Sequence, residues 1–281
     1  MPTARAFEVW GSPIDHSLSP TLHRAAYEAL GLEWTYEKRD VPAESLGEQW
    51  ESSRTLLSGL SLTMPLKEAI CDLVSDRDDA VNLIHAANTV YQRDGDFALS
   101  NTDPFGVEQA LTRHRVSATT AWIVGAGATA RAVGLALSRM GVESVSLMVR
   151  NPSRASETTD TLSELGLAVS VIPLESLAHQ EPPDLVASTI PGPAQADLEF
   201  PVAVRENSHL FDVAYAPWPS LLASQWEQSS KQVVSGLWML AYQALAQIRL
   251  FHHHDHTRAL PNEHKVFDAM TSAVGLSSTE A

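Results

Sequence analysis

The sequence has few of the residues that mark several protein classes. Cys71 is the only cysteine among 281 residues, so no disulfide can form within the chain and a secreted disulfide scaffold is excluded. Lysine and arginine number 19 against 34 aspartates and glutamates, which gives a net charge of −15. Because nucleic-acid binding depends on neutralising phosphates, this acidic balance predicts that nucleic acid is not a partner.

Long apolar runs are also missing. The sequence contains no run of roughly 18 uninterrupted apolar residues, the length that a membrane span needs. Its first residues, "MPTARAFEVWGSP", lack the apolar core of a signal peptide. We therefore expect no membrane partner and a cytoplasmic location. The hydrophobic content of 44% is enough for the cores of about two globular domains.

Strands and helices alternate along the first hundred residues. A helix is predicted at 19–31, capped by Ser19, and another begins at Pro65, whose missing N–H costs nothing in a first turn. Asp94-Gly95 predicts a hairpin between two strands. Further strands are predicted from apolar and β-branched residues at 6–11, 34–41 and 56–64.

A regular β–α–β rhythm follows and predicts a parallel sheet with helices on both faces. Its strands are predicted at 120–127, 144–150, 168–173, 185–191 and 209–215, and its helices at 128–141 and 153–166. The chain ends in helices, the first with an apolar stripe over 236–251. The domain boundary is expected near residue 104, and the spacing alone leaves open which domain the last helices join.

The segment "IVGAGATARAVG" has the spacing of a dinucleotide-binding turn. Gly125 permits a tight turn, Gly127 lets the backbone approach a pyrophosphate, and Ala130 lets helix and strand pack closely. The alternative is a turn that binds no phosphate. The next strand ends at Arg150 and Arg154 and offers no carboxylate, which favours the 2′-phosphate of NADP over the free ribose of NAD, unless both arginines are simply solvated.

Lys67 lies in the first turn of the helix after Pro65, where the partial positive charge of the helix end disfavours a cation. A lysine whose ammonium form is disfavoured can take or give a proton near neutral pH, although an ordinary surface lysine is the alternative. Asp103 is a good N-cap for the helix after it and could also bind a hydroxyl. Ser17 and Ser19 precede a helix start, which suits a carboxylate ligand.

Eight segments, in order, resemble motifs of the shikimate dehydrogenase family, whose members interconvert 3-dehydroshikimate and shikimate with NADPH. The segments are "GSPIDHSLSPTLH", "SLTMPLK", "AANTV", "NTDPFG", "VGAGATAR", "RNPSRA", "DVAYAPWPSLL" and "GLWMLAYQA". The resemblance implies an α/β fold of two domains. Residues 1–103 would form an α/β substrate-binding domain completed by C-terminal helices within 236–281, and residues 104–235 a Rossmann-type domain that binds NADP.

The resemblance also implies the chemistry, which belongs to aromatic amino-acid biosynthesis. Lys67 would be the catalytic acid/base, and Asp103 would hold the substrate hydroxyl and orient the ammonium. Ser17 and Ser19 would bind the substrate carboxylate and Tyr215 would close the site beside it. The hydroxyls would be bound by Thr63, Asn88 and Gln243. The cofactor residues would be Gly125, Ala126, Gly127, Ala128 and Thr129 at the pyrophosphate, Arg150, Asn151 and Arg154 at the 2′-phosphate, and Thr189, Val213, Gly236 and Met239 beside the nicotinamide.

The chain departs from the family pattern at several positions. Ser61 stands where the family has asparagine, which removes one hydrogen-bonding group from the floor of the expected site. Val149 and Asn151 flank Arg150 in place of the usual asparagine and threonine. The prediction that the chain selects NADP over NAD is therefore less firmly supported than the prediction that the glycine turn binds a dinucleotide. Ser220 replaces a threonine, with no functional consequence assigned.

The histidine cluster at 252–256 matches no motif of the family. Histidines at helical spacing can ligate zinc or nickel. Because the implied reaction needs no metal, we expect a solvated helix end and no metal site. The implied partners are therefore the small-molecule substrate and NADP, with the chain a monomer or a homodimer.

Two other functions fit part of the pattern. A quinate/shikimate dehydrogenase that uses NAD is disfavoured by the arginine pair. A nucleotide-binding regulator without catalysis is disfavoured because a binder has no need of both Lys67 and Asp103.

Overall fold

The computed structural model describes residues 5–277. By packing, the chain divides into two compact units. Residues up to Thr102 and from Leu240 onward form the first unit, and Asp103 to Met239 form the second. The boundary between Met239 and Leu240 lies inside one helix, α10, which spans Gly236–His253.

The first unit is an α/β layer structure. Its described elements are β1 (Ala6–Gly11), α1 (Ser19–Leu30), β2 (Thr35–Asp40), α2 (Leu46–Ser53), β3 (Gly59–Leu62), α3 (Leu66–Ala69), β4 (Asp76–Arg77), α4 (Asp79–Ile84), β5 (Thr89–Arg93), β6 (Asp96–Ser100), most of α10 and α11 (Glu263–Ala273). The strand order is β2-β1-β3-β5-β6-β4. β1 runs parallel to both of its neighbours, whereas β5 is antiparallel to β3 and β6. This sheet is therefore mixed.

The turn between β5 and β6 makes the sheet mixed. Arg93 pairs with Asp96, so the connection has two residues, Asp94 and Gly95, with φ of 54° and 91°. Two consecutive positive φ values define the tight hairpin turn whose twist matches that of the flanking strands. The predicted hairpin is confirmed.

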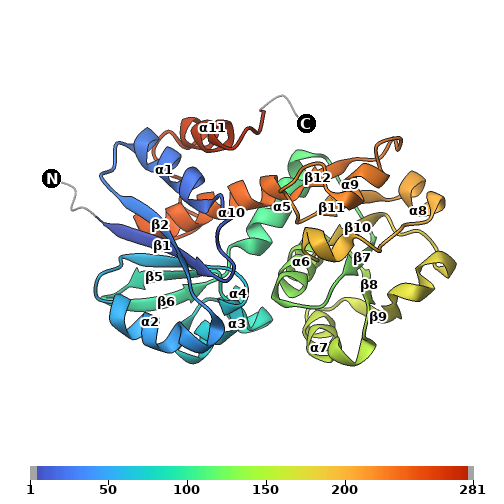
Figure 1. Ribbon diagram of the computed structural model, residues 1–281, viewed down its shortest axis with the longest axis horizontal. Helices are drawn as coiled ribbons and strands as arrows, with labels where there is room; N and C mark the ends of the chain where they lie inside the picture. The colour runs from blue at the N-terminus through green and yellow to red at the C-terminus, as the bar shows by residue number, and fades with distance from the viewer. Residues whose placement is uncertain (1–4, 278–281) are drawn as a thin grey trace. The chain divides into compact units, whose positions relative to one another are not determined.

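Side chains alternate between the two faces along a strand, and different helices pack on each face of the first sheet. On one face Trp10, Leu60 and Leu62 pack with side chains of α2, α3 and α4. On the other, Phe7 stacks on Phe251 of α10, with ring centroids 4.4 Å apart. Figure 1 shows α11 lying along α1 on this second face.

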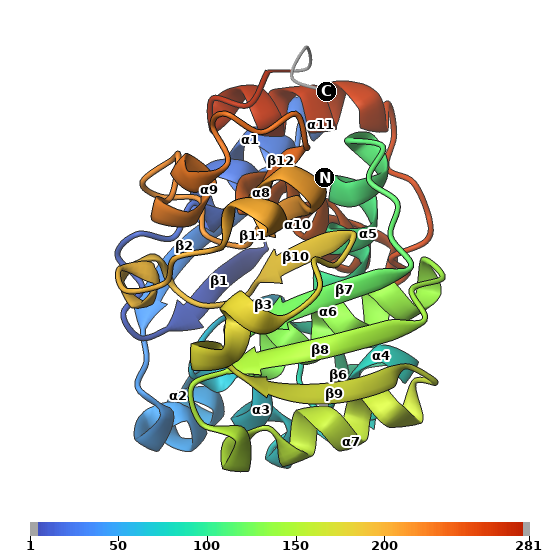
Figure 2. The same ribbon diagram turned by 90° about the vertical axis from the view of Figure 1, so that its right-hand side faces the viewer.

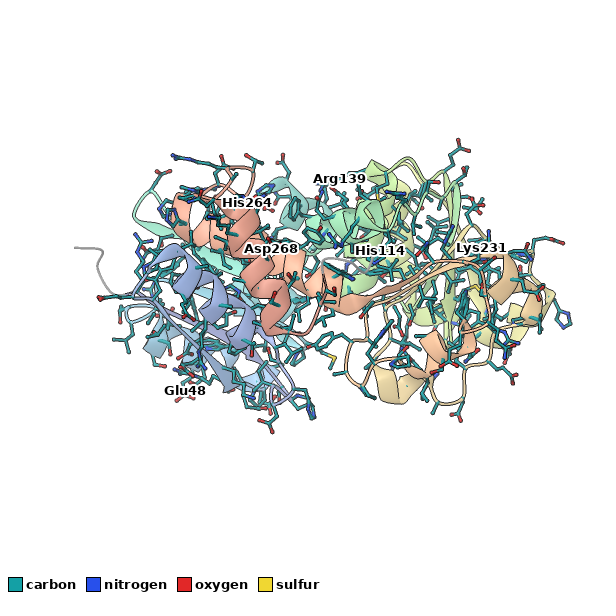
Figure 3. All side chains as sticks on the ribbon, turned by 90° about the horizontal axis from the view of Figure 1, so that it is seen from above. Glu48, His114, Arg139, Lys231, His264 and Asp268 are labelled. Atoms are coloured by element: carbon teal, nitrogen blue, oxygen red, sulfur yellow. The ribbon has the colours of Figure 1, made fainter. Side chains whose placement is uncertain are left out.

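An ion pair joins helix α11 to α10. Arg249 forms an ion pair with Glu263, with Nη2 and Oε1 2.6 Å apart and a second hydrogen bond of 2.8 Å from Nε. The outer face of α11 is polar, and His264 and Asp268, labelled in Figure 3, lie exposed on it.

The second unit contains a parallel sheet. Its elements are α5 (Asp103–Arg113), β7 (Thr120–Val124), α6 (Ala128–Arg139), β8 (Ser144–Val149), α7 (Ser156–Glu164), β9 (Ala168–Pro173), β10 (Leu185–Ser188), α8 (Val202–Asn207), β11 (His209–Asp212), α9 (Leu221–Gln225), β12 (Val233–Ser235) and the start of α10. The order is β12-β11-β10-β7-β8-β9, and every described pair is parallel. Figure 2 shows β10, β7, β8 and β9 in that succession.

The sequence order of the strands changes direction between β7 and β10: from β7 the chain first adds strands on one side, and from β10 it adds them on the other. Numbered along the chain, the six strands follow the succession 3-2-1-4-5-6 of a Rossmann fold. In such sheets ligands bind outside the carboxyl ends of the strands at the reversal. Alternate residues such as Trp122 and Val186 face a cluster with Phe200 and Trp226, while the other face carries α6 and α7. The prediction of an α/β fold with a Rossmann-type domain is confirmed.

Two local predictions were wrong. Helix α1 begins at Ser19 and its N-cap is Leu18, so Ser19 does not cap it. The N–H of Ser19 instead donates to the hydroxyl of Ser17 over 3.4 Å. Helix α3 begins at Leu66 and Pro65 is its N-cap, so Pro65 does not take the first helical position that the sequence predicted. Lys67 lies in this single turn, whose dipole is weaker than that of a longer helix.

Within residues 5–277, no helix is both long enough and apolar enough to cross a membrane.

Candidate active site

The glycine turn lies at the strand reversal of the second sheet. Gly125 follows β7 with φ of +110°, a conformation that side chains disfavour, and a Cβ there would lie 2.6 Å from Oγ1 of Thr189. Thr189 follows β10 and donates from Oγ1 to the carbonyl of Val124 over 2.8 Å. The first glycine therefore lets two strand ends approach each other closely.

The same turn has the form of a pyrophosphate site. Gly127 is the N-cap of α6 and is exposed, and a Cβ built on it would have no atom within 4 Å. Ala126, Ala128 and Thr129 beside it are half-buried. Backbone N–H groups at a helix start attract phosphate, and the open space over Gly127 lets one come close. The residues present therefore fit the diphosphate of a dinucleotide.

The predicted 2′-phosphate residues follow the next strand, β8. Arg150, Asn151 and Arg154 are all exposed. Nη2 of Arg150 donates to the carbonyl of Ala194 over 2.7 Å. Oδ1 of Asn151 accepts from the N–H and the hydroxyl of Ser153, at 3.1 and 2.8 Å, and shapes the loop. Both arginines remain accessible to a phosphate.

Two residues that the sequence did not suggest join this loop to the glycine turn. Thr158, fully buried in the first turn of α7, donates from Oγ1 to the carbonyl of Ala126 over 2.8 Å. Its neighbour Glu157 pairs with the buried Arg131 of α6, with Nη1 and Oε1 3.3 Å apart. The start of α7 is thereby fixed to both the turn and the helix that follows it.

The residues predicted beside the nicotinamide gather at the same sheet edge. Val213 follows β11 and Gly236 follows β12. A Cβ on Gly236 would lie 2.1 Å from the carbonyl oxygen of Val213, so only glycine allows this approach. With Thr189 they form one row at the carboxyl ends of the strands, while Met239 is buried one turn into α10.

Tyr215 lies in the loop after β11, and Asp212 anchors that loop. Asp212 is fully buried and accepts from Oγ of Ser220 at 2.5 Å and from Nε2 of Gln195 at 3.0 Å. Burial raises the pKa of Asp212, and the hydrogen bonds from Ser220, Ala214 and Gln195 oppose that shift. Burial also raises the pKa of the Tyr215 hydroxyl. The phenol stays neutral at physiological pH and able to donate a hydrogen bond.

In the first unit, three predicted substrate residues come from adjacent segments. The carbonyl of Asn88 accepts from the N–H of Leu62, which precedes Thr63, over 2.8 Å. The carbonyl of Lys67 accepts from the N–H of Ala87 over 2.7 Å. Thr63, Lys67 and Asn88 are therefore neighbours at the ends of β3, α3 and the segment before β5, and the Lys67 side chain is half-exposed.

Asn88 is joined to Gln243 of α10. Its Nδ2 donates to Oε1 of Gln243 over 3.2 Å and to Oγ1 of Thr102 over 3.0 Å. Its Oδ1 accepts from the N–H of Thr102 over 2.9 Å. Asp103, the next residue, begins α5 and is buried.

Ser17 and Ser19 lie together at the start of α1, with Ser19 buried and Ser17 half-buried.

His252 and His253 are the last two residues of α10. His252 and His253 approach with their Nδ1 atoms 3.2 Å apart. Over residues 5–277, however, no group of three or more His, Cys, Asp or Glu side chains is arranged to hold a metal ion.

Comparison with known proteins places this arrangement in a family. A family model described as the shikimate dehydrogenase substrate binding domain matches residues 9–90. A shikimate dehydrogenase (NADP(+)) from Thermus thermophilus is 35% identical over 275 residues, covering 96% of this chain and 99% of that protein. The chain belongs to the shikimate dehydrogenase family. The family, the NADP-dependent oxidoreductase class and the reaction predicted from the motifs are thereby confirmed.

Solved structures of shikimate dehydrogenases have the same fold. The crystal structure of the Mycobacterium tuberculosis enzyme gives a TM-score of 0.82 at 32% identity, covering 95% of this chain and 99% of that one. The crystal structure of a Thermus thermophilus enzyme in complex with NADP(H) and shikimate gives a TM-score of 0.78 at 31% identity, covering 96% of this chain and 99% of that one.

Proposed function

We propose that this chain reduces 3-dehydroshikimate to shikimate with NADPH, reversibly, and that Lys67 and Asp103 are its catalytic residues. The observation that carries the proposal is the likeness, over nearly its whole length, to shikimate dehydrogenases, one of them solved with NADP(H) and shikimate. The chain also has a glycine turn that fits a diphosphate and two accessible arginines after β8.

The proposed steps are simple. NADPH, when bound by the second unit, would supply the hydride that reduces the substrate carbonyl carbon. The Lys67 ammonium donates a proton to the carbonyl oxygen as the C–H bond forms, which completes the hydroxyl, and takes that proton back in the oxidation direction. Asp103 accepts a hydrogen bond from the same hydroxyl and orients the ammonium. A positioned acid of this kind accelerates proton transfer by about 10²–10⁴-fold.

The remaining residues bind and orient. We propose that the first unit binds shikimate, with Ser17 and Ser19 on its carboxylate and Thr63 and Gln243 on its hydroxyls. Asn88, which is hydrogen-bonded to Gln243, would also bind a substrate hydroxyl. Tyr215 would donate to the carboxylate.

We propose that the second unit holds NADP along the carboxyl edge of its sheet. Its pyrophosphate residues would be Gly125 to Thr129, its 2′-phosphate residues Arg150, Asn151 and Arg154, and its nicotinamide residues Thr189, Val213, Gly236 and Met239. The lone cysteine fits the cytoplasmic location that we also propose.

Initial rates with shikimate and with quinate, each with NADP⁺ and NAD⁺, test the proposal. We expect shikimate with NADP⁺ to give the highest kcat/KM. Faster turnover of quinate with NAD⁺ would point to the other branch of the family, and turnover of neither would contradict the proposal.

Lys67→Ala tests the assigned acid. We expect kcat to fall by about a hundredfold or more while the Kd of shikimate, from calorimetry, changes little. Lys265→Ala, at an exposed lysine of α11, is the control and keeps full activity. A Lys67→Ala variant with more than about a tenth of wild-type kcat would remove Lys67 from the mechanism.

A further inference from the structure

A polar cluster lies inside the first unit, on the sheet face that α1 and α10 cover. His23, Ser61 and Gln247 are 0%, 3% and 2% exposed. Oε1 of Gln247 accepts from Oγ of Ser61 over 3.0 Å and lies 3.2 Å from Nε2 of His23. Polar groups in an apolar interior cost free energy unless they are paired, so this cluster needs a reason.

The hydrogen bonds fix the orientation of the Gln247 amide. Its Nε2 donates to the carbonyl of Asn88 over 3.0 Å and to Oγ1 of Thr89 over 3.0 Å. A backbone carbonyl only accepts, so this end of the amide must be the nitrogen and the other end the oxygen. Both donors and both acceptor positions of Gln247 are then used.

The same reasoning fixes the state of His23. Because Oε1 of Gln247 can only accept, Nε2 of His23 carries the proton, and Nδ1 accepts from the hydroxyl of Tyr27 at 3.2 Å. Burial lowers the pKa of His23 to about 3, so the ring is neutral. His23 therefore acts as a fixed donor that holds the oxygen of Gln247.

Gln247 in turn holds Asn88. It binds the main chain of Asn88 directly and its side chain through Thr89, whose Oγ1 donates to Oδ1 of Asn88 over 2.7 Å. Asn88 passes the constraint to Gln243 and to the N–H of Thr102, the residue before Asp103. A continuous chain of hydrogen bonds thus runs from His23 to the residues proposed to bind substrate.

We propose that Gln247, held by Ser61 and His23, is a positioning residue that fixes Asn88 and Gln243 for substrate binding. The inference rests on the proposed function. This role also explains why serine stands at position 61. The short side chain of Ser61 leaves room for the Gln247 amide, which bonds to both Asn88 and Thr89. In this chain the asparagine that the family motif has at position 61 is replaced by a hydroxyl and an amide from two different elements.

Gln247→Leu is the direct test, because leucine fills a similar volume without hydrogen-bonding groups. Rates with NADP⁺ are measured with each substrate varied in turn, and the Kd of shikimate is measured by calorimetry. We expect the KM and the Kd of shikimate to rise about tenfold, the usual cost of one buried hydrogen-bond partner, and the KM of NADP⁺ to change by less than about twofold. A residue that only supports the fold would lower the fraction of active protein and leave both KM values unchanged.

Two further variants make the test decisive. Gln49→Leu removes a half-buried glutamine of α2 that accepts from Arg39 over 3.2 Å, and it should leave both KM values as in the wild type. Ser61→Ala removes one bond to Gln247 with little risk to folding, and it should raise the KM of shikimate by about threefold.

The outcomes separate the two proposals. Suppose that the wild type oxidises shikimate and that both Gln247→Leu and Ser61→Ala have the wild-type KM of shikimate. The positioning role is then wrong and the proposed function stands. If Gln247→Leu does not fold, a wild-type KM of shikimate in Ser61→Ala leads to the same conclusion. If the wild type neither binds nor oxidises shikimate, the proposed function is wrong and this inference falls with it.

Discussion

His23 gives the stability of the protein a predictable dependence on pH. Its ring is completely buried, stacks on Tyr36 with centroids 3.9 Å apart, and is hydrogen-bonded to Tyr27 and Gln247. Burial lowers the pKa of His23 from 6.5 to about 3, and the hydrogen bond to Gln247 opposes only part of that shift. The folded protein therefore keeps His23 neutral at pH values where the unfolded chain is protonated.

The sign and the size follow from linkage. Above the unfolded pKa of 6.5, His23 is neutral in both states and its full contribution to stability is present. As the pH falls from 6.5 towards 3, the unfolded chain takes up a proton that the folded protein excludes, and stability is lost. For these two pKa values, His23 alone lowers the free energy of unfolding by about 2 kcal/mol between pH 7.5 and pH 5.

Urea unfolding of the wild type and of His23→Gln at both pH values isolates this contribution, because all other titrating groups cancel in the difference. The variant should be less stable at pH 7.5, and the gap should shrink by about 2 kcal/mol at pH 5. His264→Gln, at an exposed histidine of α11, is the matched control. A gap for His23→Gln that is equal at both pH values would mean that His23 is not held neutral.

Three further predictions concern the second unit. Thr158→Val removes the hydroxyl that donates to Ala126, so initial rates should show the KM of NADP⁺ raised by about fivefold with the KM of shikimate unchanged, and equal rises in both would contradict the link. Arg154→Gln should lower the ratio of kcat/KM for NADP⁺ to that for NAD⁺ by about tenfold, and an unchanged ratio would remove Arg154 from 2′-phosphate binding. Gly236→Ala places a methyl group against the carbonyl of Val213, so calorimetry should show about 1–3 kcal/mol of destabilisation, and an unchanged Tm would contradict the close approach.

Features that depend on neighbouring residues could be predicted from the sequence. The strands at 6–11 and 168–173 have the predicted bounds because alternating side chains and flanking turn residues are local signals. The hairpin at Asp94-Gly95 was predictable because the two turn residues themselves prefer positive φ. The glycine turn was predictable for a similar reason, since Gly125 must take a positive φ between a strand and a helix.

Features that depend on packing were not predictable from neighbours. Ser19 has the right residue type for an N-cap, but it is buried in the first turn of α1 and Leu18 takes the cap position. Pro65 has the right residue type for the first position of a helix, but it is the N-cap of α3, which has four residues and continues as a 3-10 turn over Ile70–Asp72. In both cases the contacts of the folded unit decide where the helix begins or ends.

The polar positions of α10 show what kind of signal remains in the sequence. Gln243 and Gln247 are four residues apart, so they lie on one side of a helix whose neighbouring residues are apolar. A glutamine on such a face costs free energy unless a partner compensates, so the sequence alone indicates that partners exist. It cannot identify them, because Gln247 bonds to His23, 224 residues away, and to Asn88, 159 residues away. The residue at position 61 then follows from the fold: a longer side chain there would compete with Gln247 for Asn88, so a family member with asparagine at 61 should have a small or apolar residue at 247.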